Sequence, residues 1–300
     1  MDFIYQIGGI SKAPGHLAVK FHNAAGDIEW TPAALHVSRK VRMDRTIFGE
    51  DFTYLKSQVS TAVPKQTIPS PNMVHYRGGP AMLDPEVYPD LEEFWADLAV
   101  AYADEVQRLS ELGCTYLQFD DTSLAYLNDP AQRAEIAGRG EDAEHMHLRY
   151  IKQINIALAA KPEGMAITTH MCRGNFRSSW AASGAYDFVA EALFGELAVD
   201  GFFLEFDDER SGGFEPLRFV PPGKMVVLGL VTTKRGELEN PDVLKRRIEE
   251  ASKFVSLDQL CLSPQCGFSS TVEGNVLTQA DQRGKLALIV QVAHEVWGEG

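Results

Sequence analysis

The chain has 300 residues, of which 45% are hydrophobic and 23% charged, so it is long enough for one large globular domain or two small ones. Its formal net charge of −14 argues against nucleic acid or an anionic membrane as the main partner, because both recruit basic surfaces. We find no signal peptide, no apolar run near the roughly 20 residues of a membrane span, and no regular disulfide spacing among the four cysteines. These features predict a cytoplasmic protein.

The first 65 residues contain strand-like runs but no convincing β-α units. The runs IYQIGGI and LAVKFH...GDIEW are rich in β-forming residues, and the turn-forming residues NAAGD predict a hairpin. Residues 50–60, EDFTYLKSQVS, are typical of a short helix. We expect residues 1–65 to form this hairpin and a connecting segment within the same domain as residues 66–300.

Residues 66–300 alternate short β-rich runs with longer helical stretches. The runs are QTIPSP, CTYLQFDD, MAITTHMC, GFFLEFDD, KMVVLGLVTT and DQLCLSPQCG. The helical stretches carry boundary signals: Gly113 as a C-terminal stop, Asn240 followed by Pro241, and Thr278 as an N-cap. This alternation predicts a mostly parallel α/β sheet with helices outside it. Both a doubly wound sheet and a TIM (β/α)8 barrel fit this pattern.

Two observations favour the barrel. No Gly-x-Gly-x-x-Gly follows a predicted strand, which disfavours a dinucleotide-binding fold. Nearly all predicted strands end in groups that can do chemistry, as in a barrel whose active site lies at the carboxyl ends of its strands. Only six strands are recognisable, so we predict a TIM-type barrel that is incomplete at its N-terminus, with its catalytic region in residues 66–300.

The strand ends carry a candidate metal site. Cys114 and Cys261 begin their strands and are expected in the core, whereas Cys172 and Cys266 lie at or just past strand ends. His170 and Cys172 share a side if the backbone is extended, and Glu205 ends another strand. One imidazole, two thiolates and a carboxylate suit tetrahedral Zn²⁺. Such a site can activate a substrate thiol; activation of water for hydrolysis is the alternative.

Other charged residues lie at the same ends. Asp120 and Asp121 are paired carboxylates that can do acid-base work or hold an amine, and Asp120 shares a strand face with Gln118. Arg173 is suited to bind a carboxylate or phosphate, or to pair with a nearby acid. Lys234 can act as a cation or proton donor, or can simply be exposed.

The runs THMCRGN, FFLEFDD, VVLGLVTTK and LSPQCGF, in this order, resemble the C-terminal catalytic domain of cobalamin-independent methionine synthases and their short single-domain relatives. The resemblance covers residues 50–297. It implies a TIM barrel with a catalytic zinc bound by His170, Cys172, Glu205 and Cys266. It also implies that Asp120 binds the amino group of homocysteine.

The chain departs from that family in two ways. The full-length enzymes have a histidine after strand seven, where this chain has Lys234, and the family's first two strands, which help to bind homocysteine, have no counterpart here. Two explanations stay open: Met1 is an internal methionine of a longer protein, or the chain is a shortened paralogue.

We therefore predict zinc-dependent transfer of a methyl or alkyl group to a small-molecule thiol, with homocysteine as the first candidate. Asp120 and Lys234 are the predicted catalytic residues, and Asp120, Asp121 and Arg173 the predicted substrate-binding residues. The alternatives are a non-catalytic zinc-binding barrel remnant, an alkyltransferase for another thiol such as coenzyme M, and a decarboxylase with the same fold. A homo-oligomer that covers exposed sheet edges is a further prediction.

Overall fold

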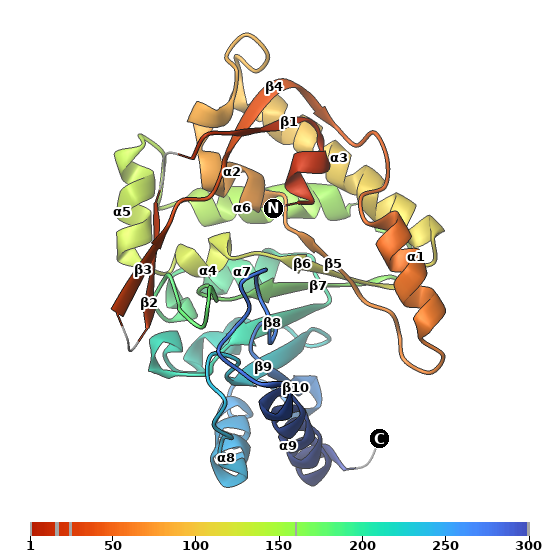
Figure 1. The fold of residues 1–300 in the computed structure, drawn as a ribbon, viewed down its shortest axis with the longest axis vertical. Coiled ribbons are helices and arrows are strands. Elements are labelled where there is room, and N and C mark those ends of the chain that lie inside the picture. Colours follow the sequence, from red (N-terminus) through yellow and green to blue (C-terminus); the bar gives the residue numbers. More distant parts are fainter. Residues whose placement is uncertain (1, 16–17, 24–25, 160, 299–300) are drawn as a thin grey trace.

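The computed structural model describes residues 2–15, 18–23, 26–159 and 161–298, and its centre is a six-stranded parallel sheet (Figure 1). The strands lie in the order β10-β9-β8-β7-β6-β5, so chain neighbours are also sheet neighbours. All six carboxyl ends therefore meet at one edge. The strands are β5 (Gln66–Pro69), β6 (Tyr116–Asp120), β7 (Ala166–Met171), β8 (Gly201–Glu205), β9 (Met225–Val231) and β10 (Leu260–Pro264).

The strands correspond to the six predicted runs, and the connections between them carry the helices. The helices are α2 (Asn72–Gly78), α3 (Leu91–Glu111), α4 (Ser123–Tyr126), α5 (Pro130–Gly138), α6 (Met146–Leu158), α7 (Ala190–Glu196), α8 (Pro241–Ala251) and α9 (Gln279–Trp297). The predicted α/β architecture with a parallel sheet is confirmed. No ladder joins β5 to β10 among the described residues, so closure of the sheet into a barrel is not observed there.

The predicted helix boundaries have the expected physical causes. Gly113 follows α3 with φ +88°, a left-handed conformation that costs glycine little. Asn240 caps α8 by accepting hydrogen bonds from the Asp242 and Val243 amides. Thr278 and Asp281 form a capping box at the start of α9. None of the helices in the described part of the chain combines the length and apolar character needed to cross a membrane.

The N-terminal segment forms two antiparallel ribbons. Strands β2 (Val19–Asn23) and β3 (Gly26–Trp30) form the predicted hairpin, whose turn residues 24–25 lie outside the described residues. IYQIGGI contributes a short 3₁₀ turn and the start of β1 (Gly8–Ala13), which pairs with β4 (Ala34–Arg42). The sequence pattern does not predict β4, which packs on α2 and α3. The predicted helix at 50–60 is α1 (Gly49–Gln58).

Candidate metal centre

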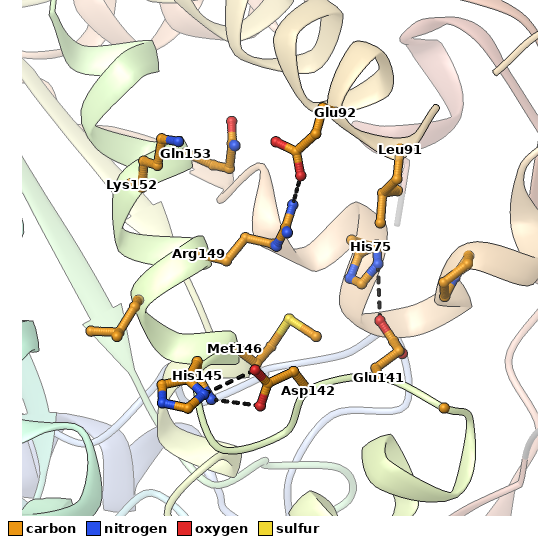
Figure 2. A pocket seen from close by; sticks show the side chains of 13 residues that line it. His75, Leu91, Glu92, Glu141, Asp142, His145, Met146, Arg149, Lys152 and Gln153 are labelled. Atoms are coloured by element: carbon orange, nitrogen blue, oxygen red, sulfur yellow. Dashed lines mark hydrogen bonds and ion pairs between the residues drawn. The ribbon is translucent and has the colours of Figure 1, made fainter. Parts of the chain in front are cut away.

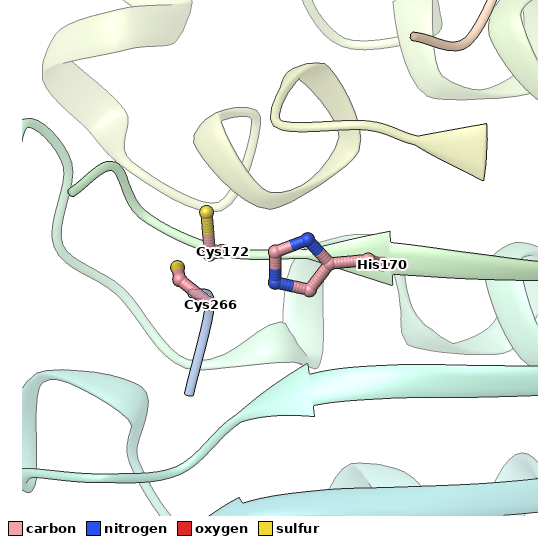
Figure 3. A group of neighbouring side chains, drawn as sticks. All are labelled: His170, Cys172 and Cys266. Carbon is pink, nitrogen blue, oxygen red and sulfur yellow. The ribbon is translucent and has the colours of Figure 1, made fainter. Parts of the chain in front are cut away.

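Three of the four predicted metal ligands meet at the carboxyl edge of the sheet (Figure 3). His170 is the penultimate residue of β7, Cys172 directly follows the strand, and Cys266 comes from the segment after β10. One ligand atom from each residue lies within 4.8 Å of the others. Cys266 has φ +50°, a strained conformation for a residue with a side chain, and such strain concentrates at functional sites. Cys172 and Cys266 are 94 positions apart in the sequence, yet the fold brings them together in one donor set.

His170 is oriented as a metal ligand would be. Its Nδ1 lies 3.1 Å from Asp120 Oδ1, while its buried Nε2 has no hydrogen-bond partner among the described residues. Metal-binding histidines commonly donate one ring N–H to a carboxylate, which leaves the other nitrogen's lone pair for the ion. The unpaired Nε2 beside two sulfur atoms therefore fits a bound Zn²⁺.

A hydrogen bond couples the titration of the two cysteines. A hydrogen bond from Cys266 and the nearby charge of His170 outweigh burial and lower the pKa of Cys172 to about 7. The same hydrogen bond, together with burial, raises the pKa of Cys266 well above its ordinary value. Of the two sulfurs, Cys172 is therefore the one whose deprotonation the surroundings favour. Thiolate and imidazole donors in this number favour zinc over Mg²⁺ or Ca²⁺.

Glu205 lies at the end of β8 as predicted, but its carboxylate faces cations. It is fully buried, accepts a hydrogen bond from the Arg173 amide, and lies 3.1 Å from both Lys234 Nζ and Arg210 Nη2. Burial raises the pKa of Glu205, but these cations outweigh it and lower the value to about 2. Glu205 is not part of the group whose ligand atoms lie within 4.8 Å of one another.

Lys234 is not an exposed lysine. Its side chain is 10% exposed, and Nζ lies 2.9 Å from Asp207 Oδ2 in addition to Glu205. Although burial lowers the pKa of Lys234, the two carboxylates raise it well above its ordinary value and keep the group cationic. Arg210, which no sequence motif singles out, contacts Glu205 and Asp208. The only sequence signal for it was its position in the acidic stretch after β8.

The predicted substrate-binding residues differ in accessibility. Asp120 is half-exposed, and no described residue makes a hydrogen bond to its Oδ2. Asp121 is fully buried and accepts hydrogen bonds from Ser70, Asn72, Ser123 and the Leu124 amide.

Arg173 is buried as well. Its guanidinium donates to Gly184 O, Glu205 O and the Tyr186 hydroxyl. Among the three predicted substrate-binding residues, Asp120 is therefore the one that is accessible and has a carboxylate oxygen, Oδ2, without a hydrogen bond from the described residues.

The hairpin β2–β3 covers the loop that follows Cys172. His22 and Trp180 exchange two backbone hydrogen bonds, of 2.7 and 3.0 Å, and their rings lie 4.7 Å apart. Phe176 packs between Phe21 and Trp30, with ring-centre distances of 5.0 and 5.3 Å. We did not predict this aromatic cover, because it joins segments about 150 residues apart.

A parallel sheet with a His-Cys-Cys donor set at its carboxyl edge makes this chain a candidate metal-dependent α/β protein. The family model described as "Cobalamin-independent synthase, Catalytic domain" matches residues 37–295, and the chain belongs to this family. The resemblance noted from the sequence is thereby confirmed.

Related proteins agree with this assignment. The uncharacterized proteins YxjG and YxjH of Bacillus subtilis (strain 168) are 44% and 45% identical, and each match covers 99% of this chain and 77% of the relative. A solved structure of a candidate vitamin-B12-independent methionine synthase from Listeria monocytogenes is 35% identical, with a TM-score of 0.74 over 99% of this chain and 78% of that one.

A B12-independent methionine synthase from Shewanella sp. W3-18-1, solved in complex with selenomethionine, shares the fold. Its TM-score is 0.69 at 20% identity, and the match covers 98% of this chain and 78% of that one. At this identity the likeness supports the architecture of the sheet and its helices.

Proposed function

We propose that the protein transfers a methyl or alkyl group to a thiol in a zinc-dependent reaction, with homocysteine as the first candidate acceptor. The observation that carries this proposal is the unpaired, buried His170 Nε2 beside the sulfur atoms of Cys172 and Cys266. When bound there, Zn²⁺ would take the substrate thiol as thiolate and so keep a reactive sulfur at neutral pH.

The protein's own residues prepare this site. Asp120 holds His170 through Nδ1, so that Nε2 points to the two sulfurs. Burial raises the pKa of Asp120, but His170 outweighs it and keeps the group below its ordinary pKa, as a carboxylate. The second oxygen of Asp120 is suited to accept hydrogen bonds from the ammonium of an amino-acid thiol such as homocysteine.

Glu205, Lys234 and Arg210 supply fixed charge next to the donor set. Glu205 is the proposed fourth ligand, and to reach an ion its carboxylate would leave one of its cations. In the transfer, a new S–C bond forms while the bond from carbon to the leaving group breaks, and the leaving group departs with the electron pair. In this proposal Lys234, a cation or proton donor held by Glu205 and Asp207, stabilises the negative charge that develops on the leaving group.

Zinc analysis of the purified protein tests the metal part of the proposal. We expect close to one zinc per chain, and a large loss in Cys266→Ser. Cys261→Ser is the matched control, because Cys261 lies in β10 but outside the donor group. A chain without zinc, or a Cys266→Ser variant with unchanged zinc, would refute the site.

Thiol alkylation assays test the reaction. Homocysteine, coenzyme M and unrelated thiols are compared with methyl and alkyl donors, and mass spectrometry detects the thioether product. Transfer to homocysteine supports the proposal as stated, and transfer to coenzyme M assigns the other acceptor. A zinc-loaded protein that alkylates none of the thiols would instead be a non-catalytic zinc-binding relative.

A further inference from the structure

A hollow of about 540 Å³ lies between α2, the start of α3 and α6 (Figure 2). Each of the carboxylates that line it contacts a basic side chain of the protein: Glu92 contacts Arg149, Glu141 contacts His75, and Asp142 contacts His145. The acidic groups of this hollow therefore already face partners inside the protein.

The candidate metal ligand Cys266 receives a hydrogen bond from the side chain of the residue before it. Gln265 Nε2 lies 3.1 Å from Cys266 Sγ. Neighbouring residues of an extended strand point to opposite faces, so a regular strand does not produce this contact. Here the register of β10 shifts between Ser263 and Pro264, and Cys266 has φ +50°. The irregular backbone therefore allows the amide to reach the sulfur.

Several contacts fix Gln265 in this position. The residue is 1% exposed, its backbone N–H donates to Val231 O at 2.8 Å, and its backbone carbonyl accepts from the Thr233 hydroxyl at 2.6 Å. Its side chain lies against Gly229 of β9, where a Cβ atom would come within 2.7 Å of Gln265 Oε1. Glycine inside a strand often marks such a close approach. The backbone contacts and the space left by Gly229 together place the amide beside the sulfur.

The two candidate sulfur ligands differ in how they are shielded. Cys172 is 6% exposed, whereas Cys266 is half-buried on the segment after β10. Alkylation of Cys266 would form an S–C bond at its sulfur while the bond from carbon to the leaving group breaks and the leaving group departs with the electron pair. A neutral thioether would then replace an anionic ligand. The more accessible sulfur is thus the one that accepts the Gln265 hydrogen bond.

We propose that Gln265 is a positioning residue that holds the Cys266 sulfur as a ligand and protects it from alkylation, so that the alkyl group goes to the substrate thiol. This inference rests on the proposed function, because it concerns a thiolate that binds zinc. A hydrogen bond to a charged acceptor is strong, and it stabilises the electron pair with which a thiolate attacks carbon. Cys172 is shielded by burial instead.

Iodoacetamide labelling of the zinc-loaded full chain tests this at the sulfur itself. Gln265→Met keeps an unbranched side chain of similar length but has no donor. We expect Cys266 to be alkylated at least about tenfold faster in this variant, a change of about 1.4 kcal/mol. Peptide mass spectrometry distinguishes Cys266 from Cys261, which should react at the same rate in both proteins. Gln265→Leu is the second variant, and circular dichroism checks that each protein is folded.

Gln259→Met is the matched control at the other end of β10. Gln259 Nε2 donates to Pro221 O at 2.9 Å and to Lys224 O at 2.8 Å. The same substitution there removes side-chain hydrogen bonds but none to a sulfur, so the labelling of Cys266 should not change. Equal acceleration in Gln259→Met would show a general loosening of the fold and would overturn the inference.

Cobalt(II) in place of zinc gives a second readout that a purely structural role would not change. The sulfur-to-cobalt charge-transfer absorption should move to lower energy in Gln265→Met, because the thiolate electrons lose a stabilising donor, and should stay unchanged in Gln259→Met. If the purified chain holds no zinc, the proposed function and this inference fall together. If zinc-loaded Gln265→Met shows unchanged labelling of Cys266 or unchanged absorption with cobalt, this inference alone is overturned.

Discussion

At the scale of a single residue, the carboxylate of Glu205 is held by two cations, and these contacts oppose its proposed role as a metal ligand. It contacts Lys234 and Arg210 inside the protein. Replacing it with Gln leaves two buried cations with less compensation, and breaking a buried pair costs about 3–5 kcal/mol. We expect Glu205→Gln to lower the free energy of unfolding by about 3 kcal/mol in urea titrations, while His170, Cys172 and Cys266 still retain zinc.

A variant without zinc but with unchanged stability would contradict this view and make Glu205 chiefly a metal ligand. The matched comparison is Asp208→Asn. Asp208 also pairs with Arg210, but its side chain is 38% exposed, so its loss should cost at most about 1 kcal/mol.

Asp120 contacts His170 through one carboxylate oxygen and, in the proposed function, would meet the substrate ammonium with the other. Oδ1 holds His170 Nδ1 at 3.1 Å, so Asp120→Asn should weaken that support and lower zinc affinity about 10- to 100-fold. Competition with a chelator measures the affinity. Asp258→Asn, at an exposed position before β10, is the control. Equal zinc affinity in Asp120→Asn would show that Asp120 does not support His170.

At the scale of elements, Glu105 joins α3 to the segment after β4. Its carboxylate is fully buried and accepts a hydrogen bond of 2.9 Å from the Ile47 amide. Burial raises the pKa of Glu105 to about 8, despite the opposing effects of Ile47 and Arg108. The folded protein thus binds a proton that the unfolded chain releases near its ordinary pKa, and stability falls as pH rises from about 4.5 to 8.

Glu105→Gln removes the titrating group, and with it this difference in proton binding between the folded and unfolded states. We expect the unmodified protein to lose up to about 1.4 kcal/mol of unfolding free energy per pH unit within that window, and the variant to lose less. Urea titrations at several pH values measure the difference. Parallel pH profiles for the two proteins would show that Glu105 is ionised in the fold.

Local signals made most elements predictable, whereas long-range pairing did not. Gly113, Asn240 and Thr278 act within one turn of their own helices, so the sequence alone indicates them. Strand β4 is polar on one face and pairs with β1 more than 20 residues away. Its partner could not be recognised from spacing.

The candidate site shows the same limit. His170, Cys172 and Cys266 were predictable because parallel strands bring their carboxyl ends to one edge. The orientation of Glu205 toward Lys234 and Arg210 depends on side-chain packing between the end of β8 and the segments that follow β8 and β9, and no spacing rule encodes it.

At the scale of the whole molecule, a bound metal would connect distant parts of the sheet. His170 and Cys172 come from β7 and the residue after it, Cys266 from the segment after β10, and β8 and β9 lie between them. A ligand that binds only the folded state stabilises it by about 2.7 kcal/mol at a hundredfold excess over its Kd.

Removing zinc with a chelator should therefore lower the Tm by several degrees, as measured by calorimetry, and adding zinc back should restore it. Cys266→Ser should show a low Tm that neither treatment changes, while Cys261→Ser should respond like the unmodified protein. If the chelator leaves the Tm of the zinc-loaded protein unchanged although the metal has been removed, the metal does not hold these strands together.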